Sequence, residues 1–355
     1  MTGKVYKFFL FFLLIFFAAA CGGKKNTTGR NDDYTDKREK IIVADEKEVN
    51  EIIIPDDWKN IDPDLLPPWL AHEYGKTAFR EKEYGFSLIF FRKALEKKKK
   101  YPEAEMWIGA VFQKEGEYIL AEQQYKKAYA QKNYLQIEED KYRILYRLAS
   151  LYGNWERKEK SYQDILLRIT GEHEYVSVFF NDRIKERIIT TFKSKGINKV
   201  LRLYRINKQF PLKAHTGLGE FYFNSGRYWD SMLNYLYSVV IVSSAAIEEF
   251  RKINPQYEFQ GIDSFLGIIL NEKLASASNY ISTPDFKEKI NAYFNDTEFY
   301  KNLLCLGKAL CAESGYFRPE ARHLWKVVMK FSKNDGISKK ADFYLNTKKL
   351  NSVIN

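Results

Sequence analysis

Five positions recur in this chain at one fixed interval of 34 residues. A glycine, a tyrosine, a small residue, an aromatic residue and an alanine reappear in the same order: Gly75 and Gly109, Tyr84 and Tyr118, Ser87 and Ala121, Phe91 and Tyr125, Ala94 and Ala128. Small residues let two helix backbones cross closely, and aromatic residues fill the space between one helix pair and the next. The interval therefore predicts consecutive helix-turn-helix units.

The pattern resembles the tetratricopeptide repeat, which reads W-x2-L-G-x2-Y in its first helix and A-x3-F-x2-A in its second. The stretch Trp69 to Pro102 and the unit after it follow this pattern, and a third unit begins near Leu212. Phe210-Pro211 precedes the third unit and resembles the aromatic-proline joint of bacterial envelope proteins of this kind. The resemblance implies an all-α fold, an α-solenoid of helix-turn-helix repeats.

Some repeats are degenerate. The unit around Gly307 and Ala321 has an interval two residues longer than that from Gly219 to Ser231, and a further unit is indicated only by Leu148-Ala149 and Tyr152. No stretch alternates with period two for long enough to make a sheet. We expect N-terminal repeats over residues 67–170 and C-terminal repeats over residues 211–355. Between them, residues 171–210 are expected to form a helical hairpin broken at Ser194-Lys195-Gly196.

The N-terminus has the features of an export signal. Lys4 and Lys7 precede an unbroken apolar run from Phe8 to Ala20, which is too short to span a bilayer and well sized for the core of a signal peptide. The small residues before Cys21 fit two interpretations: a lipobox, in which the thiol receives a diacylglycerol, or an ordinary A-x-A cleavage site. We expect lipidation of Cys21, because a lone exposed thiol is a liability in an oxidising compartment. Gly22 fits sorting to an outer membrane, so we expect a lipid-anchored protein facing the periplasm.

Residues 21–66 are expected to form a flexible tether. Residues 22–66 hold eight Lys and Arg against twelve Asp and Glu, without a sustained helical period. Such a chain has a root-mean-square span of roughly 35 to 40 Å. Residues 67–355 then carry a net charge of +13, which suits anionic lipid or acidic protein surfaces. Nucleic acid is not expected as a partner of an exported chain, and the Lys97 to Lys100 run is interpreted as a solvated loop.

No residue pattern indicates a cofactor or a metal. Cys305 and Cys311 are six apart on one expected helix, beyond disulfide reach, and the histidines lack ligand spacing. One segment, from Glu313 to Ala321, resembles the E-S-x-F-x-P-x-A motif of lytic transglycosylases, in which the glutamate is the general acid. Its proline lies one residue too far from the glutamate, and only 34 residues follow Ala321. We therefore expect a protein that is not an enzyme.

The resemblance places partner contacts on the first helix of each unit, which lines the concave groove. The aromatic and cationic groups there suit an extended peptide with acidic character. The candidates are Trp69, His72, Lys76, Phe79, Arg80, Met106, Gln113, Lys114, Lys213, Glu220, Phe223 and Asn224.

Three functions are compatible with these features. The favoured one is a membrane-anchored scaffold for protein-protein interactions in the bacterial cell envelope. More specific versions are a subunit of the outer-membrane β-barrel assembly machinery, or a structural component around a periplasmic flagellar motor or secretion complex. Peptidoglycan lysis is the least favoured function.

Overall fold

The computed structural model describes residues 58–153, 159–172, 175–176, 181–270, 284–294 and 297–354. These residues are helical with connecting turns, and no strand occurs among them. The all-α prediction is therefore confirmed. The helices are η1 (Trp58–Asn60), η2 (Pro63–Leu65), α3 (Pro68–Arg80), α4 (Tyr84–Lys97), α5 (Pro102–Lys114), α6 (Tyr118–Ala130), η3 (Lys132–Tyr134), α7 (Asp140–Gly153), α8 (Glu159–Thr170), α10 (Asp182–Leu203), α11 (Leu212–Asn224), α12 (Tyr228–Ile253), α13 (Ile262–Leu270), α15 (Pro284–Phe294), α16 (Thr297–Ser314), α17 (Pro319–Phe331), α18 (Asp335–Asn346) and α19 (Asn351–Ile354).

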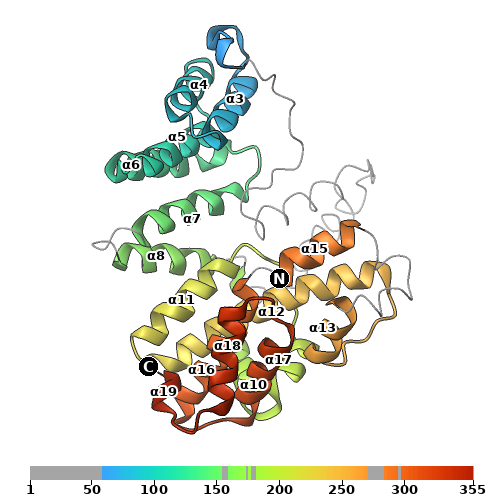
Figure 1. Ribbon diagram of the computed structural model, residues 1–355. Helices are drawn as coiled ribbons and strands as arrows, with labels where there is room; N and C mark the ends of the chain where they lie inside the picture. The colour runs from blue at the N-terminus through green and yellow to red at the C-terminus, as the bar shows by residue number, and fades with distance from the viewer. Residues whose placement is uncertain are drawn as a thin grey trace, which may run out of the picture.

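The first six α-helices stack in chain order. Each of α3 to α8 contacts the next along the chain, and α8 then contacts α11. Figure 1 shows this stack running from the blue helices down to the yellow α11, beside and below which α10, α12, α13 and α15 to α19 gather into a thicker lobe. The expected hairpin of residues 171–210 does not separate two stacks, because α10 packs against α12 and α17.

Four helix pairs share one close contact between a glycine and an aromatic ring. A Cβ atom added to Gly109 would lie 2.8 Å from the Tyr125 ring, and one added to Gly219 would lie 2.9 Å from the Tyr235 ring. The other two pairs are Gly75 with Phe91, at 2.6 Å, and Gly307 with Trp325, at 2.5 Å to Nε1. These distances leave no room for a side chain, so glycine is required at each crossing.

A small hydroxyl residue fixes two of the same crossings. Ser87 donates a hydrogen bond from its hydroxyl to the carbonyl of Gly75 at 2.9 Å, and Ser231 does the same to Gly219 at 2.7 Å. Both serines are fully buried. The first helix of the pair is thereby bonded to the second by a side chain too small to separate them.

The turn within a pair needs one residue with a left-handed backbone. Gly116, Gly226 and Gly315 have φ values of 81°, 73° and 74° in these turns. Lys82 holds the matching position in the first pair with φ 64°. Lys82 lies 34 residues before Gly116. The left-handed turn residue therefore recurs at the repeat interval, although the first pair has lysine in place of glycine.

Helix α12 is the centre of the lower lobe. It packs against α10, α11, α15 and α16, and nearly all of its residues from Ser231 to Phe250 are buried. By length and composition alone it could cross a membrane, but 94% of its apolar window is buried inside the fold. Its apolar composition is therefore explained by its central position. It ends at Ile253, before Asn254-Pro255.

Helix α10 has a kink at the glycine where we expected a break. Gly196 has φ 76° and ψ 177°, which interrupts the helical hydrogen bonding. Two side chains from the C-terminal part hold the kink: Glu320 accepts a hydrogen bond from the Ile197 N–H at 2.8 Å, and Arg318 donates to the Lys193 carbonyl at 2.9 Å. The kink is thus stabilised by residues more than a hundred positions later in the chain.

The end of the expected tether belongs to the folded part. Trp58 is buried against Phe86 and Phe90, and its Nε1 donates to Glu81 at 3.3 Å. Lys97 donates to the carbonyl of Leu66 at 2.5 Å. Residues 58–66 therefore pack on α3 and α4 and are not part of a flexible tether, so the predicted boundary at residue 66 is too late. These residues lack helical periodicity, but Trp58 fixes them to the folded part. The expected signal peptide (1–20) and Cys21 lie outside the described residues.

Candidate functional site

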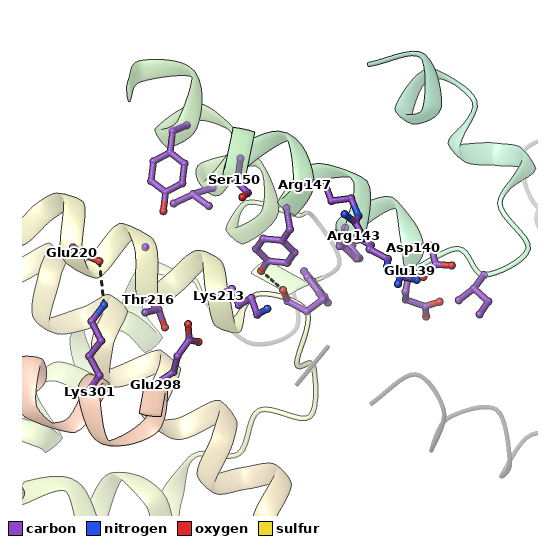
Figure 2. A pocket seen from close by; sticks show the side chains of 18 residues that line it. Glu139, Asp140, Arg143, Arg147, Ser150, Lys213, Thr216, Glu220, Glu298 and Lys301 are labelled. Atoms are coloured by element: carbon purple, nitrogen blue, oxygen red, sulfur yellow. Dashed lines mark hydrogen bonds and ion pairs between the residues drawn. The ribbon is translucent and has the colours of Figure 1, made fainter. Parts of the chain in front are cut away.

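A cavity of about 450 Å³ lies where three helices converge. Its walls come from α7, the start of α11 and the first turn of α16, with Tyr162 and Leu166 of α8 closing one side. Figure 2 shows the side chains of these helices directed toward the same space. Helices α7, α11 and α16 are each the first helix of a packed pair, so the cavity lies between first helices.

One face of α7 supplies the longest wall. Tyr142, Arg143, Tyr146, Arg147 and Ser150 recur three or four residues apart, which places them on one side of a helix. From α11 come Lys213, Thr216, Gly217 and Glu220, and from α16 come Glu298 and Lys301, again at helical spacing.

Tyr146 joins α7 to the segment before α11. Its hydroxyl donates to the Phe210 carbonyl and accepts a hydrogen bond from the Ala214 N–H at 3.2 Å. Burial raises the pKa of Tyr146 far above its usual value, so the phenol stays neutral. Tyr142 stacks on the Phe210 ring, with centroids 4.0 Å apart and planes at 8°. The aromatic part of the expected Phe210-Pro211 joint therefore forms a rigid apolar wall of the cavity.

The charged residues of the cavity are balanced in sign. Four cationic side chains (Arg143, Arg147, Lys213, Lys301) face four carboxylates (Glu139, Asp140, Glu220, Glu298). Lys301 pairs with Glu220 at 3.6 Å, as the dashed line in Figure 2 shows. The guanidinium groups of Arg143 and Arg147 lie over the Trp107 ring of α5, 5.7 and 4.8 Å from its centroid. This aromatic contact helps to fix the positions of both guanidinium groups.

Two of the twelve predicted groove residues line this cavity: Lys213 and Glu220. Trp69, Arg80, Lys114 and Asn224 are exposed elsewhere on the surface, and Gln113 and Phe223 are half-buried. Gln113 accepts a hydrogen bond from the Tyr125 hydroxyl at 2.7 Å, and the Lys308 ammonium covers Phe223 at 4.4 Å. These two side chains therefore contribute to packing.

The remaining four groove candidates are buried, and the prediction of partner contact is wrong for them. His72 packs between Phe91 and Tyr101, and Phe79 packs against Trp107 of the next pair. Lys76, only 8% exposed, pairs with Glu73 at 2.6 Å, and Met106 is 3% exposed. The first helix of one pair contacts the first helix of the next. This contact buries side chains that would be exposed to solvent in a single repeat.

Sequence reasoning missed the α7 and α16 walls of the cavity. The available signal was the degenerate unit around Leu148-Ala149, since its first helix places Arg143, Tyr146 and Ser150 at the same face positions as groove candidates of the other units. The contribution of Glu298 and Lys301 depends on long-range packing that no local pattern records.

The segment resembling a lytic transglycosylase motif lies outside the cavity. The Glu313 carboxylate pairs with Lys193 of α10 at 2.8 Å, and Ser314 lies beside it at 3.4 Å. Glu320, further along the segment, accepts the Ile197 N–H at the kink of α10. These carboxylates connect the C-terminal helices to α10.

Three other features from the sequence have structural partners. Lys97, Lys98 and Lys100 each contact a carbonyl or a tyrosine ring of their own chain, which supports interpreting this run as a surface loop. Cys305 and Cys311 are free thiols on α16, and burial raises the pKa of both. Within the described ranges, no group of three or more His, Cys, Asp or Glu residues is placed to hold a metal ion.

The comparisons with known proteins give two partial matches. No known protein family matches the chain. An uncharacterized protein of Treponema pallidum (strain Nichols) is 25% identical over 168 residues, which cover 47% of this chain and 45% of that protein. An uncharacterized protein of Borreliella burgdorferi (strain B31) is 22% identical over 288 residues, which cover 74% of this chain and 85% of that protein. The chain thus spans less than half the length of the first relative and most of the second.

Proposed function

We propose that this chain is a scaffold of the tetratricopeptide type, anchored to a bacterial envelope membrane, that binds a segment of another protein. The cavity between α7, α11 and α16 carries the proposal, because first helices of helical repeats line the groove in which such proteins hold their partners. The recurring contact of a glycine with an aromatic ring supports the repeat interpretation.

The partner we propose is an extended segment with an acidic side chain. The wall of Tyr142 and Phe210 offers a rigid apolar surface, and Arg143 and Arg147 are held in place over Trp107. Pre-organised aromatic and guanidinium groups are the side chains that contribute most to protein interfaces. Glu220 and Glu298 would repel an acidic group at the other end of the cavity, so we place this group beside the arginines, where Glu139 and Asp140 also limit its approach.

Binding, rather than catalysis, is proposed because the one segment that resembles a catalytic motif lies outside the cavity, where the Glu313 carboxylate pairs with Lys193 of α10 at 2.8 Å.

We further propose that export and lipidation at Cys21 place the domain in the periplasm at an outer membrane. The apolar run from Phe8 to Ala20 and the small residues before the cysteine support this proposal. Mass spectrometry of the mature N-terminal peptide is expected to show an acylated cysteine. A free thiol, or an intact signal peptide, would refute lipidation and leave the binding proposal untouched.

A site-specific crosslink tests the binding site itself. Ser150 is exposed at the cavity, whereas Gln123 is exposed on α6, away from it. A photo-crosslinking amino acid at residue 150 is expected to capture one protein in intact cells, and the same group at residue 123 is not. Ser150→Trp should block the cavity and lower co-purification of that protein at least tenfold at unchanged melting temperature, with Gln123→Trp as the matched control. Equal capture at both positions, or full co-purification with Ser150→Trp, would place binding elsewhere.

A further inference from the structure

The positive charge of this protein is concentrated in two segments. Residues 182–208 hold nine Lys and Arg against two Asp and Glu, a net charge of +7. Residues 321–355 hold eight against two, a net charge of +6. Residues 67–355 carry a net charge of +13, so the residues of this range that lie outside the two segments have a net charge of zero. A compositional bias toward lysine would spread the excess along the chain, so composition does not explain it.

The two segments are neighbours in the fold. Helix α10 contacts α17, and its kink is bonded to Arg318 in the turn before α17 and to Glu320 in the first turn of α17, while Lys193 pairs with Glu313 at the end of α16. In Figure 1 they lie at the end of the molecule opposite the blue helices α3 and α4. We call residues 182–208 and 321–354 together the basic lobe.

Several exposed cations of the basic lobe have no carboxylate partner. Lys185 and Lys193 pair with Asp182 and Glu313. Among the described residues, no ion pair involves the exposed lobe residues Arg183, Arg187, Lys195, Lys326, Lys339 and Lys340. Unpaired like charges repel one another, so an external anion would stabilise this arrangement.

Large apolar side chains are exposed among these cations. On α17, Arg322, Lys326, Met329 and Lys330 recur at helical spacing on the solvent side, and Met329 is 45% exposed; Lys333 follows in the turn after the helix. On α18, Phe343 is 51% exposed and follows Lys339 by one helical turn. Cations beside exposed apolar side chains match the two layers of a lipid surface, in which anionic headgroups lie above acyl chains.

We propose that the basic lobe binds the surface of an anionic phospholipid membrane. This inference rests on the proposed membrane anchoring and adds a second contact to it. A diacylglycerol anchor already supplies two acyl chains, so the basic lobe is not needed for attachment itself; it adds an electrostatic contact whose strength depends on the anionic lipid present. Docking by the lobe lays the domain against the membrane instead of leaving it free at the end of a tether.

The test uses the full lipidated chain bound through its anchor to vesicles, either of zwitterionic lipid or of a mixture containing anionic phosphatidylglycerol. Lysines are modified by an amine-reactive reagent, and each site is quantified by mass spectrometry. Labelling of Lys326, Lys330, Lys339 and Lys340 is expected to fall several-fold on the anionic vesicles and to recover in high salt, because screening weakens the contact. Lys99 and Lys114, exposed in the stack, should label equally on both.

Charge reversal provides the second measurement. Lys326→Glu with Lys330→Glu is expected to lower partitioning onto anionic vesicles on the order of tenfold or more relative to zwitterionic ones, and Lys99→Glu with Lys114→Glu is the matched control. A chain that associates with both vesicles yet shows no protection of the lobe would overturn this inference alone. A chain that associates with neither would refute the anchor. Protection by soluble polyphosphate but not by anionic vesicles would assign the lobe to a polyanion and also overturn it.

Discussion

The crossing of α5 and α6 offers a direct test of the repeat geometry. Gly109→Ala adds a single methyl group at the point where Gly109 faces Tyr125. The new Cβ would lie 2.8 Å from two ring carbons and 3.3 Å from the Ala121 carbonyl oxygen. Tyr125 cannot move aside, because its ring is fully buried and its hydroxyl is bonded to Gln113.

The magnitude follows from two opposing terms. Alanine is favoured over glycine in a helix by about 1 kcal/mol, and overpacking a rigid site costs about 1 to 3 kcal/mol. Because normal carbon contacts begin near 3.4 Å, the helices must separate by about half an ångström, and the upper half of that cost applies. We expect a net loss of about 1 to 2 kcal/mol. Gly85→Ala is the matched control: no atom lies within 4 Å of its added Cβ, and it should gain about 0.5 to 1 kcal/mol.

Thermal unfolding followed by circular dichroism separates the two variants. For a chain of this size, about 1 kcal/mol corresponds to a shift of roughly 2 °C or more in melting temperature. Gly109→Ala should therefore melt several degrees below Gly85→Ala, although the chemical change is identical. Equal melting temperatures, or a more stable Gly109→Ala, would refute the close crossing at Gly109.

Four further variants are expected to give defined results. Stability should be greatest near pH 6.5. Burial lowers the pKa of His215 to about 4, so this buried neutral side chain costs up to about 3 kcal/mol of folding free energy as pH falls from 6.5 to 4. In urea unfolding measured at a series of pH values, His215→Gln should reduce this loss of stability at acid pH. His323, whose pKa its hydrogen bond to Glu320 raises to about 9, contributes about 1 to 2 kcal/mol that is lost as pH rises from 6.5 to 9, and His323→Gln should remove that alkaline loss. Ser231→Ala should cost about 1 to 2 kcal/mol, measured by urea unfolding, because the Gly219 carbonyl loses its buried partner. Glu313→Gln should leave capture at the cavity unchanged and the purified protein without muropeptide release; release by the native chain that vanishes in the variant would contradict the scaffold proposal.

The helix pairs were predictable because their determinants are local. Gly75 and Ser87 are twelve residues apart, and their sizes fix both the crossing and the bond between them. The same holds for Gly196, since a glycine with basic residues on either side and no capping partner nearby predicts a break. Size and backbone freedom are properties of single residues, so the sequence displays them.

Exposure was less predictable, for a physical reason. Phe79 and His72 follow the pattern of groove positions, yet Trp107 and Tyr101 of the next pair cover them. A repeat register specifies where a side chain lies on its own helix, whereas burial depends on the size of the residue that arrives from the neighbouring pair. The cavity required even more distant information, because Lys301 of α16 pairs with Glu220 of α11 across it.

The kink of α10 implies an order of folding events along the chain. The bonds that close the α3–α4 crossing join residues twelve apart, so this pair can form as soon as it is synthesised. The two hydrogen bonds at the Gly196 kink join residues that are 123 and 125 positions apart in the chain. Closing a loop over such a separation has a large entropic cost. The Ile197 amide and the Lys193 carbonyl must therefore wait for α17, and the second half of α10 acquires its final direction among the last events of folding. A chain ending before Arg318 would keep its N-terminal stack and leave α10 without the contacts that bend it.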